Sequence, residues 1–245
     1  MYAKKNNGKK IIVILLAIVM LIGGTIGGTL AWLSATSGAV TNTFTVGDVN
    51  IELKEHYLKA DGRTLDTSSE VTEENTYKIV PGDTQPKDPF VRVEKDSEDS
   101  WIFVQVKEVR NDVTGNANAT KYVTWEIADG WKKLGATTNG VSTYYRTTNY
   151  TTSSTDTTYY VLKGGSNENT SGIVSYDSDL TKANIEALDA DKDGSVANTE
   201  MPQLIFKAFA VQAEAAGTYT DVTTGATAAW NQIAEADKLS SVSDS

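Results

Sequence analysis

Short apolar runs with a period of two residues recur along most of the chain and constrain its fold more than any other feature. They lie at residues 44–53, 90–93, 101–109, 122–127, 141–146, 157–162 and 204–212. Successive side chains of a β-strand point to opposite faces, so this period indicates strands with one buried face. Turn-forming clusters separate the runs, among them Pro81-Gly82-Asp83, Asp129-Gly130, Asn139-Gly140 and Lys163-Gly164-Gly165. We therefore expect an all-β fold, an antiparallel jelly-roll-like β-sandwich.

Two connecting segments have a helical pattern instead. Ser178 to Leu188 carries an N-cap candidate in Ser178 or Asp179, followed by an apolar side. Ala226 to Lys238 places Trp230 and Ile233 on one face. The polar stretch from Thr147 to Thr158 is typical of a solvated loop or an outer hairpin. The sequence therefore predicts a sandwich with two short helices in its connections.

The N-terminus has the pattern of an export signal. Four lysines at positions 4, 5, 9 and 10 precede an apolar run from Ile11 to Ile22 and a glycine-rich exit that ends Thr29-Leu30-Ala31. A basic end, an apolar stretch and small residues before the cleavage point define such signals. We expect a signal peptidase to cleave after Ala31, which gives a secreted protein without stable membrane association. The alternative is a permanent anchor, because about 20 apolar residues can span a bilayer.

The predicted domain organisation follows from that cleavage. Residues 1–31 form the signal peptide, 32–46 an N-terminal segment, 47–239 the β-sandwich domain, and 240–245 a disordered tail. The chain has 22 basic and 32 acidic residues, and the signal contains four of the basic ones. An acidic surface repels nucleic acid, so we expect no nucleic-acid partner. With no cysteine, the exported protein cannot use disulfides for stability.

One twelve-residue segment matches the calcium loop of EF-hands. Residues 189–200 place Asp189, Asp191 and Asp193 at loop positions 1, 3 and 5, glycine at position 6, and Glu200 at position 12. Ser195 would add its backbone carbonyl, and Val196 would pack inward. Met201-Pro202 then interrupts the exit helix of an EF-hand. We therefore predict structural calcium (Ca²⁺) rather than a sensor, although an acidic surface turn is the simpler alternative.

Several islands along the chain resemble the TasA/camelysin family. They are Gly27-Gly28-Thr29-Leu30-Ala31-Trp32-Leu33-Ser34, residues 40–49, Val80-Pro81-Gly82-Asp83 with Lys87-Asp88-Pro89, Ile102-Phe103-Val104-Gln105-Val106, residues 206–213 and Ala229-Trp230. The resemblance implies release by a SipW-type signal peptidase. It also implies a biofilm matrix subunit that self-assembles into homopolymer fibres, in which the N-terminal segment of one subunit completes the sheet of the next. Residues 32–46 are the candidate donor strand.

Two other classes of function have weaker support. Camelysin in that family is described as a metalloprotease, but this chain has a single histidine, His56, and no His-Glu-x-x-His motif. A lone histidine just past a strand is expected to be an exposed turn residue, so we predict no enzyme activity. A carbohydrate-binding adhesin is the third class, because Trp101, Trp125, Trp131 and Trp230 with Tyr144, Tyr145, Tyr159 and Tyr160 could form an aromatic face. Core packing is the alternative for those rings.

Overall fold

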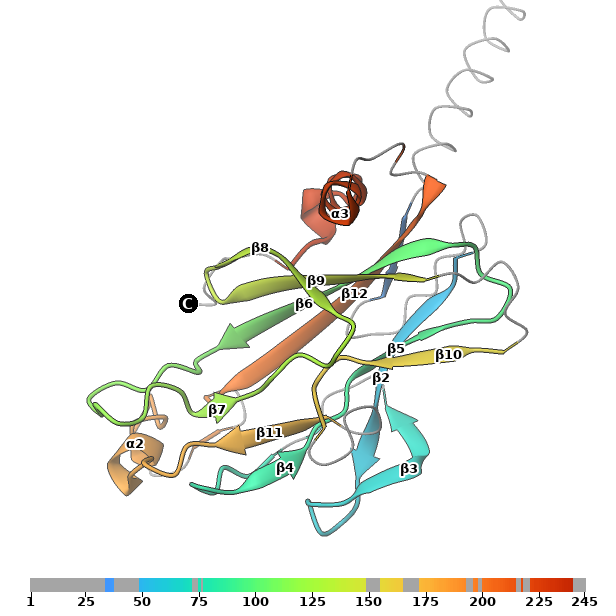
Figure 1. Ribbon diagram of the computed structural model, residues 1–245. Coiled ribbons are helices and arrows are strands. Elements are labelled where there is room, and N and C mark those ends of the chain that lie inside the picture. The colour runs from blue at the N-terminus through green and yellow to red at the C-terminus, as the bar shows by residue number, and fades with distance from the viewer. Residues whose placement is uncertain are drawn as a thin grey trace, which may run out of the picture.

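The computed structural model describes residues 34–37, 49–71, 75, 77–148, 155–164, 172–192, 196–197, 200–214, 217 and 221–239. In this part of the chain the protein is an antiparallel, all-β sandwich with two short α-helices, as predicted (Figure 1). The strands are β1 (Ser34–Ser37), β2 (Ile51–Leu58), β3 (Leu65–Val71), β4 (Thr84–Pro86), β5 (Phe90–Val93), β6 (Ser100–Val109), β7 (Val123–Thr124), β8 (Lys132–Thr138), β9 (Val141–Thr148), β10 (Thr157–Tyr160), β11 (Ile173–Tyr176) and β12 (Gln203–Gln212).

One layer is a five-stranded sheet in the order β1-β12-β6-β9-β8. Its centre is the long pair of β12 and β6, which runs from Gln203 opposite Val109 to Gln212 opposite Ser100. The last strand thus lies between the first strand and β6. The other layer consists of a four-stranded sheet, β10-β5-β2-β3, and a small three-stranded sheet, β4-β11-β7. The separate three-stranded sheet was not expected from the sequence.

Strand β6 is buried on both of its faces, which explains its unbroken run of large apolar residues. Ile102, Val104 and Val106 belong to the main core between the layers. Trp101 and Phe103 alternate with them and belong to a second core on the outer face. Helix α3 (Val222–Trp230) covers that face (Figure 1), where Ala226, Ala229 and Ile233 pack against the two rings and against Phe209. Because alternate side chains of β6 point to opposite faces of the sheet, this strand contributes to both cores.

Both predicted helices exist, but their boundaries differ from the prediction. Helix α2 (Lys182–Glu186) is capped by Thr181, whose hydroxyl accepts the amide of Asn184. Ser178 and Asp179 are therefore not the N-cap, because Asp177 holds them in a preceding turn through the amide of Asp179.

Helix α3 begins four residues earlier than predicted and ends at Trp230 rather than Lys238. The side chain of Asp221 caps it by accepting the amides of Thr223 and Thr224. A short 3-10 helix, η2 (Glu235–Asp237), follows after a turn. The expected polar loop is also shorter, since β9 extends to a buried Thr148 and β10 begins at Thr157.

The N-terminal segment contributes the short edge strand β1. Ser34 to Ser37 pair antiparallel with Val211 to Ala208 of β12. The remaining expectations for the termini fall outside the described residues: the signal peptide 1–31 and its cleavage, the strand residues Phe44 and Val46, and the tail 240–245. Among the described helices, none is long and apolar enough to cross a bilayer.

Candidate functional site

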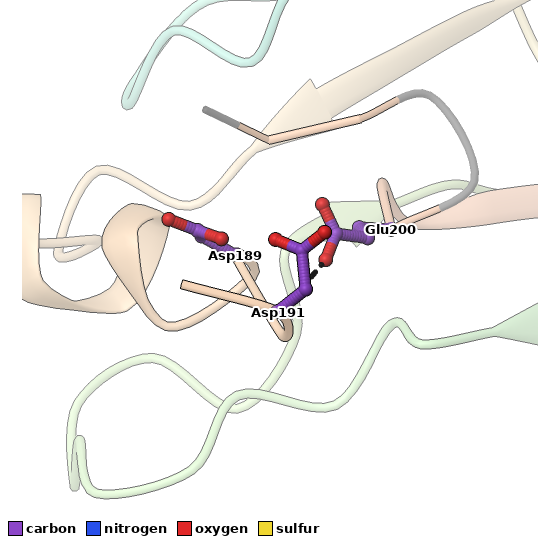
Figure 2. A group of neighbouring side chains, drawn as sticks. All are labelled: Asp189, Asp191 and Glu200. Carbon is purple, nitrogen blue, oxygen red and sulfur yellow. Dashed lines mark hydrogen bonds between the residues drawn. The ribbon is translucent and has the colours of Figure 1, made fainter. Parts of the chain in front are cut away.

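The predicted calcium loop brings three carboxylates together between α2 and β12. Carboxylate oxygens of Asp189, Asp191 and Glu200 all lie within 4.8 Å of one another (Figure 2). Asp189 and Glu200 are half-buried and Asp191 is exposed. Hard cations such as calcium prefer oxygen ligands of this kind. Two other predicted ligands, Asp193 and Ser195, lie outside the described residues.

Glu200 organises the loop through its own hydrogen bonds. Its Oε1 accepts the amides of Ala190 at 2.7 Å and Asp191 at 3.3 Å. Its Oε2 accepts the amide of Ala197 at 2.8 Å. A carboxylate offers about four lone-pair sites, so three of them are engaged. The donor set fits calcium in its chemistry and proximity, but bidentate binding by Glu200 would require some of these amides to be released.

The two ends of the loop are anchored in the body of the domain. Leu188, just before the loop, is buried in the main core, and Val196 packs against the same core as predicted. After Glu200 the chain passes through Met201 and Pro202 directly into β12. The loop therefore joins a helix to a central strand, and the exit helix of an EF-hand is replaced by that strand.

His56 is not the exposed turn residue that the sequence predicted. It lies inside β2, and only 8% of its surface is exposed. Its Nδ1 is 2.6 Å from Oδ2 of Asp88, whose Oδ1 accepts the backbone amide of His56 at 3.1 Å. Burial raises the pKa of Asp88, an effect that the bonds from His56 partly offset. The single histidine thus takes part in a buried hydrogen-bonded contact at the point where β2 leaves β5.

The aromatic side chains considered for a carbohydrate-binding face pack inward instead. Trp101, Trp131, Tyr144 and Tyr145 are buried. Trp125 and Tyr159 are half-buried against the main core, and Trp230 against the second. Tyr160 contacts Phe90 edge to face. Within the described part of the chain these rings therefore pack as core and sheet-face residues, the alternative that the sequence had left open.

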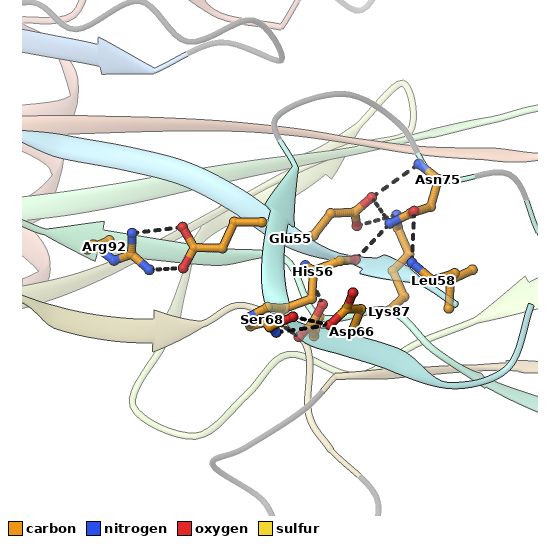
Figure 3. Close-up of polar contacts among 10 residues, drawn as sticks. Glu55, His56, Leu58, Asp66, Ser68, Asn75, Lys87 and Arg92 are labelled. Atoms are coloured by element: carbon orange, nitrogen blue, oxygen red, sulfur yellow. Dashed lines mark hydrogen bonds and ion pairs between the residues drawn. The ribbon is translucent and has the colours of Figure 1, made fainter. Parts of the chain in front are cut away.

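A second polar cluster, around Glu55, was missed by the sequence analysis. Glu55 on β2 contacts Lys87, which follows β4, and Asn75, which follows β3 (Figure 3). Asn75 is 20 positions and Lys87 is 32 positions from Glu55, so no local pattern in the sequence connects them. The only signal was indirect, because Lys87 belongs to one of the islands that resemble the TasA/camelysin family.

Comparisons with known proteins do not assign the chain to a family. A scan against protein-family models found no match, and searches of curated proteins and of solved structures found none either.

Proposed function

We propose that this protein is a secreted structural subunit of an extracellular matrix, and that it assembles into homopolymer fibres by donor-strand complementation. The resemblance to the TasA/camelysin family and the export signal support this proposal. The observation that carries it is the position of β1, which occupies the edge of the five-stranded sheet beside β12.

Among the described residues, only part of the outer edge of β12 is paired with a strand. β1 pairs with residues 208–211, whereas β12 begins at Gln203. On this side, residues 203–207 have no strand partner among the described residues. Unpaired backbone groups at a sheet edge form a template for another strand. A neighbour's N-terminal segment can make the same main-chain bonds as β1 and extend along residues 203–207.

Calcium in the 189–200 loop would stabilise the same strand. Glu200 lies three positions before Gln203, so an ion held by Asp189, Asp191 and Glu200 fixes the entrance to β12. Extracellular modules bind calcium at about 10⁻⁴ to 10⁻³ M. The site would therefore fill after export and act as a structural clip.

The donor strand can be tested with paired cysteines, since the natural chain contains none. Ala35 faces Ala210 across the two strands, a position at which a disulfide can form. In oxidised assemblies of Ala35→Cys with Ala210→Cys, donor exchange predicts a ladder of linked subunits on a non-reducing gel. A purely monomeric band would show that β1 pairs within its own chain and would contradict donor exchange.

Electron microscopy of the secreted protein, with and without calcium, tests assembly itself. Deleting residues 32–40 should leave a folded monomer, and deleting the tail 240–245 is the matched control that should still form fibres. Fibres from the N-terminally truncated protein would contradict the donor assignment. Chelator-sensitive proteolysis, or binding to a glycan array without fibres, would favour the metalloprotease or the adhesin instead.

The calcium proposal has a separate readout. At 100 times its dissociation constant, calcium should stabilise the native state by about 2.7 kcal/mol. Calorimetry over a calcium titration that reaches about 100 times the dissociation constant should show a rising melting temperature, and Asp189→Ala with Glu200→Ala should abolish the increase. Glu235→Ala, which removes an exposed acid elsewhere, is the control. An unchanged melting temperature of the unmodified protein would exclude the clip without affecting the test of donor exchange.

A further inference from the structure

The carboxylate of Glu55 connects a lysine and an asparagine at the wall of one small cavity. Its Oε2 lies 3.0 Å from Nζ of Lys87, and its Oε1 accepts Nδ2 of Asn75 at 2.8 Å. Lys87, Asn75 and Tyr77 line a cavity of about 110 Å³. Figure 3 shows the side chains of Glu55, Asn75 and Lys87 converging from three separate segments. One carboxylate, a group able to move protons, thus contacts both an amine and an amide.

The lysine amine lies close to two aromatic rings and has little access to solvent. Nζ of Lys87 lies 4.9 Å from the ring centre of Tyr77 and 5.5 Å from that of Phe206. The Lys87 side chain is 12% exposed and that of Glu55 10%. Burial raises the pKa of Tyr77, so its hydroxyl stays neutral. The amine of a lysine is a nucleophile once a neighbouring base has taken its proton, and Glu55 is the carboxylate in contact with it.

We propose that Lys87 and Asn75 form an intramolecular isopeptide bond, with Glu55 as the general acid and base. Glu55 takes a proton from the Lys87 ammonium, and the free Nζ attacks Cγ of Asn75. The tetrahedral intermediate then loses Nδ2 as ammonia, to which Glu55 returns the proton. One N–C bond forms, one N–C bond breaks, and the released ammonia carries away the second proton as ammonium. No oxidant or other reactant is needed.

The hydrogen bonds of Asn75 suit each stage of this reaction. The backbone amide of Leu58 donates to Oδ1 of Asn75 at 3.3 Å, where it can stabilise the negative charge that develops on that oxygen. Nδ2 also donates to the carbonyl of His56 at 3.0 Å, which fixes the plane of the amide. Held in this way, the reacting groups do not have to meet by diffusion, and such positioning lowers a barrier substantially.

The bond would give a chain without cysteines a covalent cross-link. It would close the segment between positions 75 and 87 and tie the residues after β3 to the connection between β4 and β5. Reducing agents do not break an isopeptide bond, whereas they do break a disulfide. The proposal does not depend on fibre formation or on calcium.

Peptide mapping of the purified full chain tests the proposal. Trypsin should release residues 64–78 joined to residues 79–92, with the combined mass reduced by one ammonia molecule and with no cleavage after Lys87. Fragmentation should place the link between Asn75 and Lys87. Finding the two peptides separate, with normal cleavage after Lys87, would overturn the proposal, and so would loss of ammonia within Asn75 alone.

Variants separate the reaction from the fold. Glu55→Gln keeps both reacting side chains and should abolish the cross-linked peptide, whereas Glu108→Gln should leave it intact. Asn75→Asp should form the same amide by losing water, and its product should have the mass of the cross-linked natural protein. Circular dichroism confirms that each variant is folded. A complete cross-link in Glu55→Gln would overturn the role of Glu55.

Discussion

Two clusters in this protein contain the same three functional groups at different depths. In the Glu55 cluster, one carboxylate contacts Lys87 and Asn75. In the Glu108 cluster, one carboxylate contacts Lys121 at 2.7 Å and Asn111 at 3.0 Å. The side chain of Lys87 is 12% exposed and that of Lys121 is 37% exposed. The chemistry open to such a group therefore depends on its surroundings rather than on the residue types alone.

In the Glu108 cluster, the surroundings of Lys121 stabilise its charged ammonium group and do not favour a cross-link to Asn111. Burial alone would lower the pKa of Lys121, but hydrogen bonds to Asp112 and Glu108 and the charges of both acids together raise it. Its amine therefore stays protonated. Asn111 is also fixed by the backbone of Val123, which it contacts through both its oxygen and its nitrogen at 2.8 Å. We expect no cross-link between Lys121 and Asn111, which makes this pair an internal control in the peptide map.

The largest difference between the clusters should appear when each glutamate is removed. Glu55→Ala leaves the Lys87 ammonium buried without its carboxylate and should reduce the free energy of unfolding by about 3–5 kcal/mol. Glu108→Ala should reduce it by only about 1–2 kcal/mol, because water reaches Lys121 while Asn111 and Trp125 each lose an acceptor. Urea unfolding of both variants measures the two losses.

A double variant checks the reason for that difference. Glu55→Ala combined with Lys87→Met leaves no unpaired charge, so it should recover the part of the loss that the buried ammonium causes in Glu55→Ala. Equal losses in the two single variants would show that burial does not distinguish the clusters.

The Glu108 cluster should contribute less to the stability of the fold as the pH falls. Burial alone would raise the pKa of Glu108, but hydrogen bonds from Lys121, Asn111 and Trp125 together with the charge of Lys121 lower it below its ordinary value of 4.5. A carboxyl group with a lowered pKa contributes stability that is fully present above the unfolded value and is lost as the pH falls through the folded value. Glu108→Gln should therefore lose less stability than the natural protein as the pH falls below about 4.5.

The comparison must be made between variant and natural protein at each pH. Asp88 has a raised pKa, because burial outweighs its bonds to His56. A raised carboxyl pKa acts in the opposite direction, so its contribution to stability decreases as the pH rises above the unfolded value of 3.8. If the free energies of unfolding of Glu108→Gln and of the natural protein change in parallel below about pH 4.5, Glu108 does not have a lowered pKa.

The sequence predicted the parts of the fold that depend on local pattern. β6 and β12 have long alternating apolar runs, and Asn139-Gly140 forms the expected turn, with positive φ at both residues. β3 and β8 were missed because their sequences, LDTSSEV and KKLGATT, are mainly polar. Both are edge strands, and an edge needs less apolar surface than a core strand.

The candidate sites likewise differ in how far apart their residues lie in the sequence. The carboxylates of the 189–200 loop are close in sequence, so their spacing alone indicated that Asp189, Asp191 and Glu200 lie together. His56 was assigned wrongly because its partner, Asp88, is 32 positions away. The contact among Glu55, Asn75 and Lys87 likewise depends on how the sheets pack. A pattern read along the chain contains no information on such contacts.

The smallest expected effect concerns the two lysines and salt. Lys121→Ala should cost at most about 1 kcal/mol, because exposed ion pairs contribute little. That cost should decrease between 0.1 M and 1 M sodium chloride, where the Debye length shortens from about 10 Å to about 3 Å. Lys87→Ala should cost more and should depend little on salt, because the variant cannot form the isopeptide bond and the contribution of a covalent bond is not screened by ions. Urea unfolding of both variants at the two salt concentrations measures the four values. If salt reduced the cost of Lys87→Ala as strongly as that of Lys121→Ala, Lys87 would contribute through an ion pair open to solvent and not through a covalent bond.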